Sequence, residues 1–154
     1  MIYYHYAELV HRQAEKYGSR TALKYRDNAT GKWLKISWKE FSEKVMLTAK
    51  AMAEFGIGVQ ENIGVYSQNM PQCFYTDFGA YANRVVSIPM YATNSPGQIE
   101  YIINDAHIHT LFVGEQLQYN NAFKVQKESQ YLKRLVVFDP AVKLNPEDLS
   151  LIHI

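Results

Sequence analysis

Cysteine is almost absent from this sequence, and several other features that would announce a function are missing with it. The single cysteine, Cys73, excludes an internal disulfide and is typical of a protein from a reducing compartment. Apolar runs are far shorter than the roughly 20 residues that span a bilayer. Residues 1–6 lack the basic start and apolar stretch of a secretory signal peptide. Together these absences predict a cytoplasmic protein.

Charge of one sign is not concentrated anywhere in the chain. The net charge is +1, and no block of five or more Lys and Arg residues occurs. The sequence therefore lacks the basic patch that nucleic-acid binding requires. Tyrosine, in contrast, occurs 12 times. Because large rings bury much area, a chain of 154 residues with this composition can form a well-packed core.

The first third of the chain predicts helices around a hairpin. The expected elements are a helix at 4–17 ending at Gly18, strands at 21–26 and 33–37, and a helix that follows Ser37 and stops at Gly56. Ser37 and Glu40 form the pattern of a capping box, in which each side chain accepts a hydrogen bond from a free backbone N–H. The turn at 27–31 joins the two strands into a β-hairpin with a longer loop.

From residue 63 onward, strands and helices alternate. The expected elements are strand 63–66, a helix to 81, strand 85–90, a helix to 106, strand 110–113, helix 115–129 and strand 134–138. Asn69 is predicted to cap the first of these helices with Pro71 in its first turn, and Ser95 with Gln98 forms a second capping box. Alternation of this kind implies parallel pairing with right-handed crossovers. The fold class is therefore α/β: an N-terminal β-hairpin and helices followed by a βαβαβαβ, mostly parallel sheet.

Each candidate for chemistry also has a simpler structural explanation. Residues 56–58 hold two glycines but follow a helix, so a helix stop is favoured over a nucleotide loop. Residues 94–98 open a helix whose N–H groups could hold a phosphate, although Ser and Gln in this segment serve capping. His107 and His109 could share a metal, and Cys73 in the first turn of a helix could be nucleophilic. Both lack the nearby partner residues that such sites need, so no catalytic, cofactor-binding or metal residue is assigned.

Parallel sheets bind ligands outside the carboxyl ends of their strands. In this chain those ends are residues 67–69, 91–94 and 114–115. The pattern locates a crevice there without naming a ligand.

Six ordered blocks of sequence carry a family resemblance. They read YGSRTALKYRD, TGKW followed by ISWKEF, SQNMP, VSIPMYATNSP, EYIIND and LFVGEQ. Together they span about residues 6–139 and resemble the N-terminal region of adenylate-forming acyl-CoA synthetases, with the TGKW hairpin closest to the long-chain branch. Tyr91 and Thr93 lie inside a matching block at a strand end. They are the candidates for a pocket wall or an interface, against turn and packing roles.

The resemblance implies an acid–thiol ligase that turns a fatty acid, ATP and CoA into acyl-CoA, AMP and pyrophosphate through an acyl-adenylate. ATP is needed because a carboxylate is a poor electrophile, and Mg would neutralise phosphate charge. The family's phosphate loop, rich in Ser, Thr and Gly and carrying a Lys, has no counterpart here. The chain alone is therefore expected to be inactive. Its expected partners are the remainder of its own chain, fatty acid and CoA, with a homodimer left open and at most peripheral membrane association.

The end of the chain departs from the family. Residues 149–154 are one translation of CTGTCTCTTATACACATC, the mosaic end used in transposon-made sequencing libraries. This match predicts that 149–154 is a non-native, adapter-derived tail and that 1–148 is the N-terminal portion of an AMP-binding domain. An ordinary apolar strand at a real terminus is the alternative.

Two other functions stay open on the sequence alone. One is a complete, small flavodoxin-like α/β binding module without catalysis. The other is a fragment of an adenylate-forming ligase for a different acid, medium-chain or aryl.

Overall fold

The computed structural model describes residues 5–27, 29–148 and 151–153. Its contacts divide the chain into two compact units. Unit 1 comprises residues 1–59 and 70–85, and unit 2 comprises residues 60–69 and 86–154. The chain therefore crosses between the units three times.

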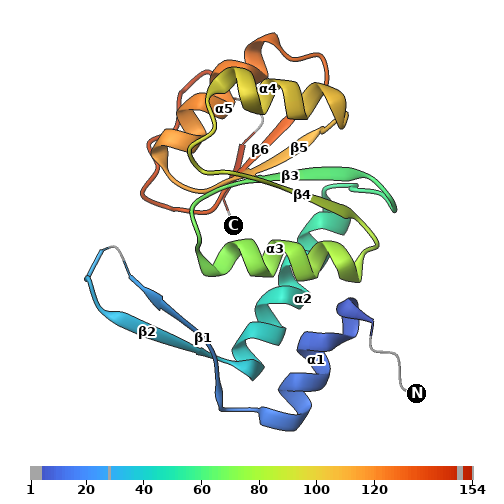
Figure 1. Cartoon of the computed structure of the whole chain (residues 1–154), viewed down its shortest axis with the longest axis vertical. Helices are drawn as coiled ribbons and strands as arrows, with labels where there is room; N and C mark the ends of the chain where they lie inside the picture. Colours follow the sequence, from blue (N-terminus) through green and yellow to red (C-terminus); the bar gives the residue numbers. More distant parts are fainter. Residues whose placement is uncertain (1–4, 28, 149–150, 154) are drawn as a thin grey trace. The chain divides into compact units, whose positions relative to one another are not determined.

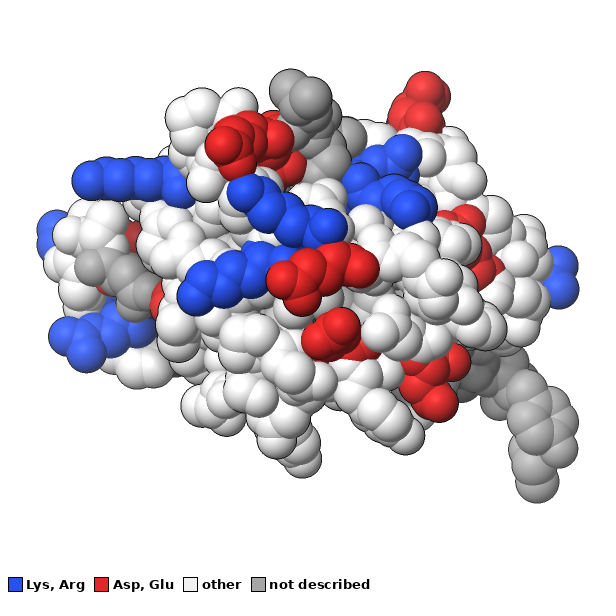
Figure 2. Space-filling model, turned by 90° about the horizontal axis from the view of Figure 1, so that it is seen from above, with Lys and Arg blue, Asp and Glu red and all other residues white. Residues whose placement is uncertain are grey.

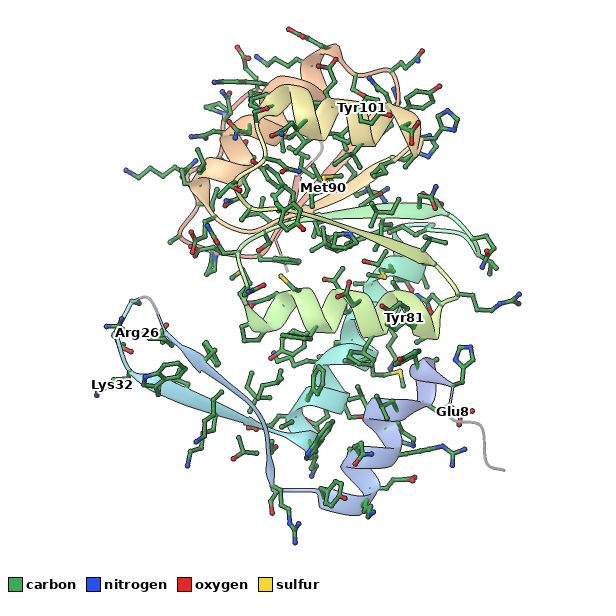
Figure 3. All side chains as sticks on the ribbon, viewed as in Figure 1. Glu8, Arg26, Lys32, Tyr81, Met90 and Tyr101 are labelled. Atoms are coloured by element: carbon green, nitrogen blue, oxygen red, sulfur yellow. The ribbon has the colours of Figure 1, made fainter. Side chains whose placement is uncertain are left out.

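Unit 1 is helical apart from one hairpin (Figure 1). Its elements are α1 (Tyr6–Tyr17), β1 (Thr21–Arg26), β2 (Trp33–Ser37), α2 (Trp38–Glu54) and α3 (Pro71–Ala82). The two strands pair antiparallel, which confirms the predicted hairpin. Gly31, at φ 67°, supplies the left-handed residue of the turn. The Arg26 side chain donates from Nε to the Gly31 carbonyl at 3.2 Å, at the hairpin tip where Figure 3 places Arg26 and Lys32.

The start of α2 confirms the capping box. The Ser37 backbone N–H donates to the Glu40 carboxylate at 2.8 Å, and the Glu40 N–H donates to the Ser37 hydroxyl at 3.2 Å. Hydrogen bonds from the backbone and the hydroxyl of Ser37 lower the pKa of Glu40. The helix then buries Phe41, whose ring centre lies 5.8 Å from that of Tyr75 and 5.7 Å from that of Phe78 on α3. Aromatic packing between α2 and α3 is thus a main component of the unit 1 core.

Unit 2 is a sheet with two helices packed on one face (Figure 1). Its elements are β3 (Asn62–Tyr66), β4 (Val86–Met90), α4 (Pro96–Asp105), β5 (Thr110–Val113), α5 (Gln116–Glu128), β6 (Arg134–Val137) and β7 (Leu151–His153). The strand order is β4-β3-β5-β6-β7, and every pair is parallel. This topology confirms the predicted α/β class and the parallel pairing.

Strands β3, β5 and β6 of unit 2 are buried on both faces. Leu111 and Val113 pack in the cluster that includes residues of α4 and α5, whereas Phe112 points to the opposite face and is equally buried. Met90 at the end of β4 also joins the cluster, where Figure 3 shows its side chain among the strands and helices. Burial on both faces explains why these strands appear in the sequence as continuous apolar runs.

One predicted cap is wrong. α3 begins at Pro71 with Met70, not Asn69, as its N-cap residue. The residue before a proline is held in extended conformation, and Met70 has φ −141° and ψ 159°. It therefore takes the cap position without a capping side chain. The other predicted element ends agree with the structure or differ from it by at most two residues, as fraying ends commonly do.

Half of the predicted tail, 149–154, falls outside the described residues. Residues 149, 150 and 154 are not among them, while Leu151–His153 forms β7 beside β6. Strand pairing does not depend on the origin of a sequence. The adapter-derived tail therefore stays a prediction.

Candidate functional site

The carboxyl ends of β3, β4 and β5 meet at one edge of the unit 2 sheet. Tyr66, the last residue of β3, is fully buried, with 0% of its surface exposed. Its hydroxyl donates to the Asn94 carbonyl at 2.6 Å and accepts a hydrogen bond from the Asn121 amide at 3.1 Å. One buried side chain thus ties the β4–α4 loop to α5.

A second polar contact holds the same loop. Gln118, 1% exposed in the first turns of α5, donates from Nε2 to the Ala92 carbonyl at 3.0 Å. Its Oε1 accepts a hydrogen bond from the Glu115 backbone N–H at 3.1 Å. Because both ends of the amide are satisfied, the side chain has a single orientation. The loop of residues 91–95 is therefore fixed at two points.

Gly114 allows the loops after β3 and β5 to touch. Its backbone N–H donates to the Tyr66 carbonyl at 3.0 Å. A Cβ at this position would lie 2.3 Å from Ser67 Oγ and 3.1 Å from Ser67 Cα. Such distances are well inside van der Waals contact, so only glycine fits between the two strand ends.

The predicted candidates Tyr91 and Thr93 both lie on the fixed loop and both are exposed. The Tyr91 side chain has 82% of its surface exposed, directly after the end of β4. No hydrogen bond or ring contact holds either side chain among the described residues. Their position is compatible with a pocket wall or an interface, and that role stays a prediction.

The loops at this edge carry no charge that could hold a polyphosphate. Residues 67–69, 91–94 and 114–115 contain neither Lys nor Arg. Across the described part of the chain, no three His, Cys, Asp or Glu side chains gather as metal ligands. These loops therefore supply no Lys or Arg side chain to a phosphate group.

Comparison with known protein families assigns the chain to one of them. The family model described as AMP-binding enzyme matches residues 10–150. This chain belongs to the AMP-binding enzyme family. A curated relative, long-chain-fatty-acid–CoA ligase ACSBG2 of Xenopus laevis, is 24% identical over 136 residues, which cover 88% of this chain. The chain spans only 18% of the length of that relative.

Solved structures share the fold of this AMP-binding chain. Coronafacic acid ligase from Pectobacterium brasiliense aligns over 97% of this chain and 28% of its own, with a TM-score of 0.83 and 13% identity. A benzoate CoA ligase from Burkholderia xenovorans LB400 aligns over 92% of this chain and 27% of its own, with a TM-score of 0.76 and 21% identity. At such identities the likeness establishes the fold alone. The family match over residues 10–150 is what confirms the expected resemblance.

The structure also places the other candidates that the sequence offered. Gly56 ends α2 with φ 74°, and Ser95 with Gln98 forms the second capping box. The ring of His107 lies 4.5 Å from that of Tyr131, and His109 Nδ1 lies 4.0 Å from Glu61 Oε1. Cys73 is half-buried in the first turn of α3. No described helix has the length and apolar character needed to cross a membrane.

The sequence predicts the loops at the strand ends, but it does not predict that Tyr66 and Gln118 hold the loop of residues 91–95 in place. The sequence pattern predicts only that Tyr66 is part of an apolar strand. Its hydrogen-bond partners Asn94 and Asn121 lie 28 and 55 positions away along the chain. The sequence contains only a weak signal for these hydrogen bonds. Gln118 and Asn121 are polar residues three positions apart, so they share one side of α5.

Tyr66→Phe should therefore lower the free energy of unfolding by about 1–2 kcal/mol, because the Asn94 carbonyl and the Asn121 amide lose a buried partner. Tyr101→Phe is the matched control. Tyr101 projects outward from α4 (Figure 3) and has 70% of its surface exposed, so the same chemical change should leave stability unaltered. Urea denaturation of both variants measures the difference. Equal stabilities would contradict a structural role for the Tyr66 hydroxyl.

Proposed function

We propose that this chain is the N-terminal portion of the adenylation domain of an ATP-dependent acyl-CoA ligase whose acid is a long-chain fatty acid. The supporting observation is the family match over residues 10–150, together with the relatedness to a long-chain-fatty-acid–CoA ligase over 88% of the chain. The proposed reaction forms an acyl-adenylate from acid and ATP and then transfers the acyl group to the thiol of CoA.

In the proposed reaction, these residues position other parts of the adenylation domain. The strand-end loops contain no Lys or Arg, so the charge that stabilises the phosphates in the transition state must come from elsewhere in the protein. What the chain contributes is a rigid edge: the loop of residues 91–95, held by Tyr66 and Gln118. In the proposal, this edge is one wall against which the rest of the adenylation domain packs. A cytoplasmic location is part of the same proposal.

The identity of the acid is the finer part of the proposal. Relatives of similar fold are named for coronafacic acid and benzoate, which makes an aryl acid the second candidate. The two candidates predict different substrate preferences. With the longer reading frame that contains this chain, palmitate should support ATP–pyrophosphate exchange with a kcat/KM at least about tenfold above that for benzoate, equivalent to about 1.4 kcal/mol.

Octanoate is the third acid to be assayed, and it distinguishes a medium-chain enzyme from a long-chain one. A higher kcat/KM for benzoate than for palmitate would reject the fatty acid and keep the ligase family. A preference for octanoate over palmitate would reject the long chain alone.

A further inference from the structure

The β1–β2 hairpin of unit 1 has two chemically different faces. Its cross-strand pairs are, in order toward the tip, Leu23 with Ile36, Lys24 with Lys35, Tyr25 with Leu34, and Arg26 with Trp33. Because side chains alternate along a strand and paired residues share a face, the second and fourth pairs lie on one face and the others on the opposite face. Leu23 and Ile36 pack against the core of unit 1. The face formed by Lys24, Arg26, Trp33 and Lys35, here called the basic face, therefore points away from that core.

The basic face is open to solvent. All four of its side chains are exposed, and the Trp33 ring has 70% of its surface exposed. The hairpin tip extends beyond the helices of unit 1 (Figure 1), and Figure 3 places Lys32 at this tip with Arg26. Neighbours on one face of a strand pair are about 7 Å apart along a strand and about 5 Å apart across it. One large ring and several cations are thus gathered on a small, flat surface.

Positive charge is concentrated on this hairpin. Residues 21–37 contain four Lys and Arg residues and one acidic residue, a net charge of +3, whereas the whole chain has +1. The acidic residue, Asp27, accepts hydrogen bonds from Thr30, through the backbone N–H at 3.0 Å and through the hydroxyl. Among the ion pairs of the described residues, none involves a cation of the hairpin. Lys24 and Lys35 repel each other because like charges lie directly opposite, so an anion bound across them would be stabilising.

The size of this charged surface favours a lipid surface over a nucleic acid. A protein that binds duplex DNA commonly makes about 6–10 phosphate contacts, more than the four cations of the hairpin supply. Figure 2 shows Lys and Arg mixed with Asp and Glu over the face that it presents, so no broad basic field is visible there. Clusters of about four cations are enough to attract an anionic bilayer. An exposed tryptophan beside them is typical of side chains that lie at the boundary between headgroups and acyl chains.

We propose that the basic face of the β1–β2 hairpin docks on a membrane surface that contains anionic phospholipid. The Lys and Arg side chains contact the headgroup anions, and the Trp33 ring inserts at the interface. All of these side chains stand on the same side of one strand pair, so they can touch a flat surface together. A few cations and one ring give a reversible attachment. The proposal rests on the hairpin alone and is independent of the acid and of the reaction.

The test is co-sedimentation of the protein made from the longer reading frame with phosphatidylcholine vesicles that contain or lack phosphatidylserine. The protein should bind the vesicles that contain phosphatidylserine, and added NaCl should weaken the binding because salt screens exposed charges. Lys24→Gln combined with Lys35→Gln should lower the partition coefficient at least about tenfold. Since this substitution removes a repulsive pair, it should not destabilise the hairpin, and urea denaturation checks the fold. Lys24→Arg with Lys35→Arg keeps the charge and should keep binding.

A second double variant is the matched control. Lys44→Gln with Lys50→Gln makes the same change in net charge at exposed positions of α2. It should alter vesicle binding by less than about twofold, because charges away from the bound surface are screened. Trp33→Ala should weaken binding by about fivefold, since the ring no longer inserts at the interface.

Three results would overturn the membrane-binding face. The first is a wild-type protein that does not bind vesicles with phosphatidylserine, and the second is an equal loss of binding in the two Lys→Gln double variants. The third is binding to duplex DNA that depends on Lys24 and Lys35, without binding to vesicles, which would make the hairpin a nucleic-acid surface. ATP–pyrophosphate exchange on the same preparations reports separately on the proposed function. If exchange is absent while vesicle binding depends on the hairpin, the proposed function fails and the membrane-binding face is supported.

Discussion

Gly114→Ala is expected to lower the free energy of unfolding by about 3 kcal/mol, the upper part of the range for overpacked sites. The added Cβ would lie 2.9 Å from Ser67 Cβ as well as 2.3 Å from Ser67 Oγ. Rotating the hydroxyl away relieves only one of these contacts. The third, at 3.1 Å from Ser67 Cα, involves the backbone and requires the ends of β3 and β5 to move apart. That movement would strain the Gly114 N–H bond to the Tyr66 carbonyl.

Gly97→Ala is the matched control for this substitution. Gly97 lies in the first turn of α4, and an added Cβ there would meet nothing within 4 Å. Replacing glycine by alanine in a helix stabilises it by up to about 1 kcal/mol. Urea denaturation should therefore separate the two variants in opposite directions. Adding Ser67→Gly to Gly114→Ala should restore part of the loss, because two of the three contacts disappear. If Gly114→Ala and Gly97→Ala have the same stability, the strand ends are not in close contact.

Much of this fold could be predicted from the sequence because its signals are local. The hairpin turn needs Gly31 at positive φ, and the capping boxes at Ser37 and Ser95 need partners only three residues away. The strands of unit 2 are short apolar runs between helices, so their parallel pairing follows from connectivity. The prediction of Asn69 as the cap was wrong, and the reason is also local. Pro71 fixes the first helical position, and it makes the residue before it the cap.

The strand order and the tethers of the candidate site could not be predicted in this way. Placing β3 between β4 and β5 depends on the whole sheet, and no residue of β3 encodes its neighbours. The Tyr66 hydroxyl meets Asn94 and Asn121 only after α4 and α5 have packed on the sheet. The contact between residue 143 and α5 has the same origin, because the Gln116 side chain forms hydrogen bonds with the Lys143 backbone, 27 positions away. Long-range contacts of this kind leave no periodic pattern in the sequence.

The second large effect concerns activity. ATP–pyrophosphate exchange should be absent from the 154-residue chain and present in the protein made from the longer reading frame. Exchange requires stabilisation of charge that develops on the phosphates, and the strand-end loops of this chain offer no cation for it. The longer frame is expected to contain, within a few tens of residues of position 148, a loop rich in Ser, Thr and Gly that carries a Lys.

A substitution in that loop is the control for the exchange assay. In the longer protein, replacing its Lys by Met should reduce exchange by at least about a hundredfold, comparable to the loss of a single donor from a preorganised anion site. Thr93→Ser, which keeps a hydroxyl on the exposed loop, should retain exchange within about threefold. A Lys variant with full activity would place the phosphate clamp elsewhere in the protein.

We propose that these residues are the scaffold part of an acyl-CoA ligase, and an exchange assay on the short and the longer protein tests this proposal. Both proteins are incubated with palmitate, ATP, magnesium and labelled pyrophosphate, and the formation of labelled ATP is followed. We expect palmitate-dependent label in ATP for the longer protein and none above background for the 154-residue chain. Exchange catalysed by the short chain alone, or no exchange with any carboxylic acid by the longer protein, would contradict it.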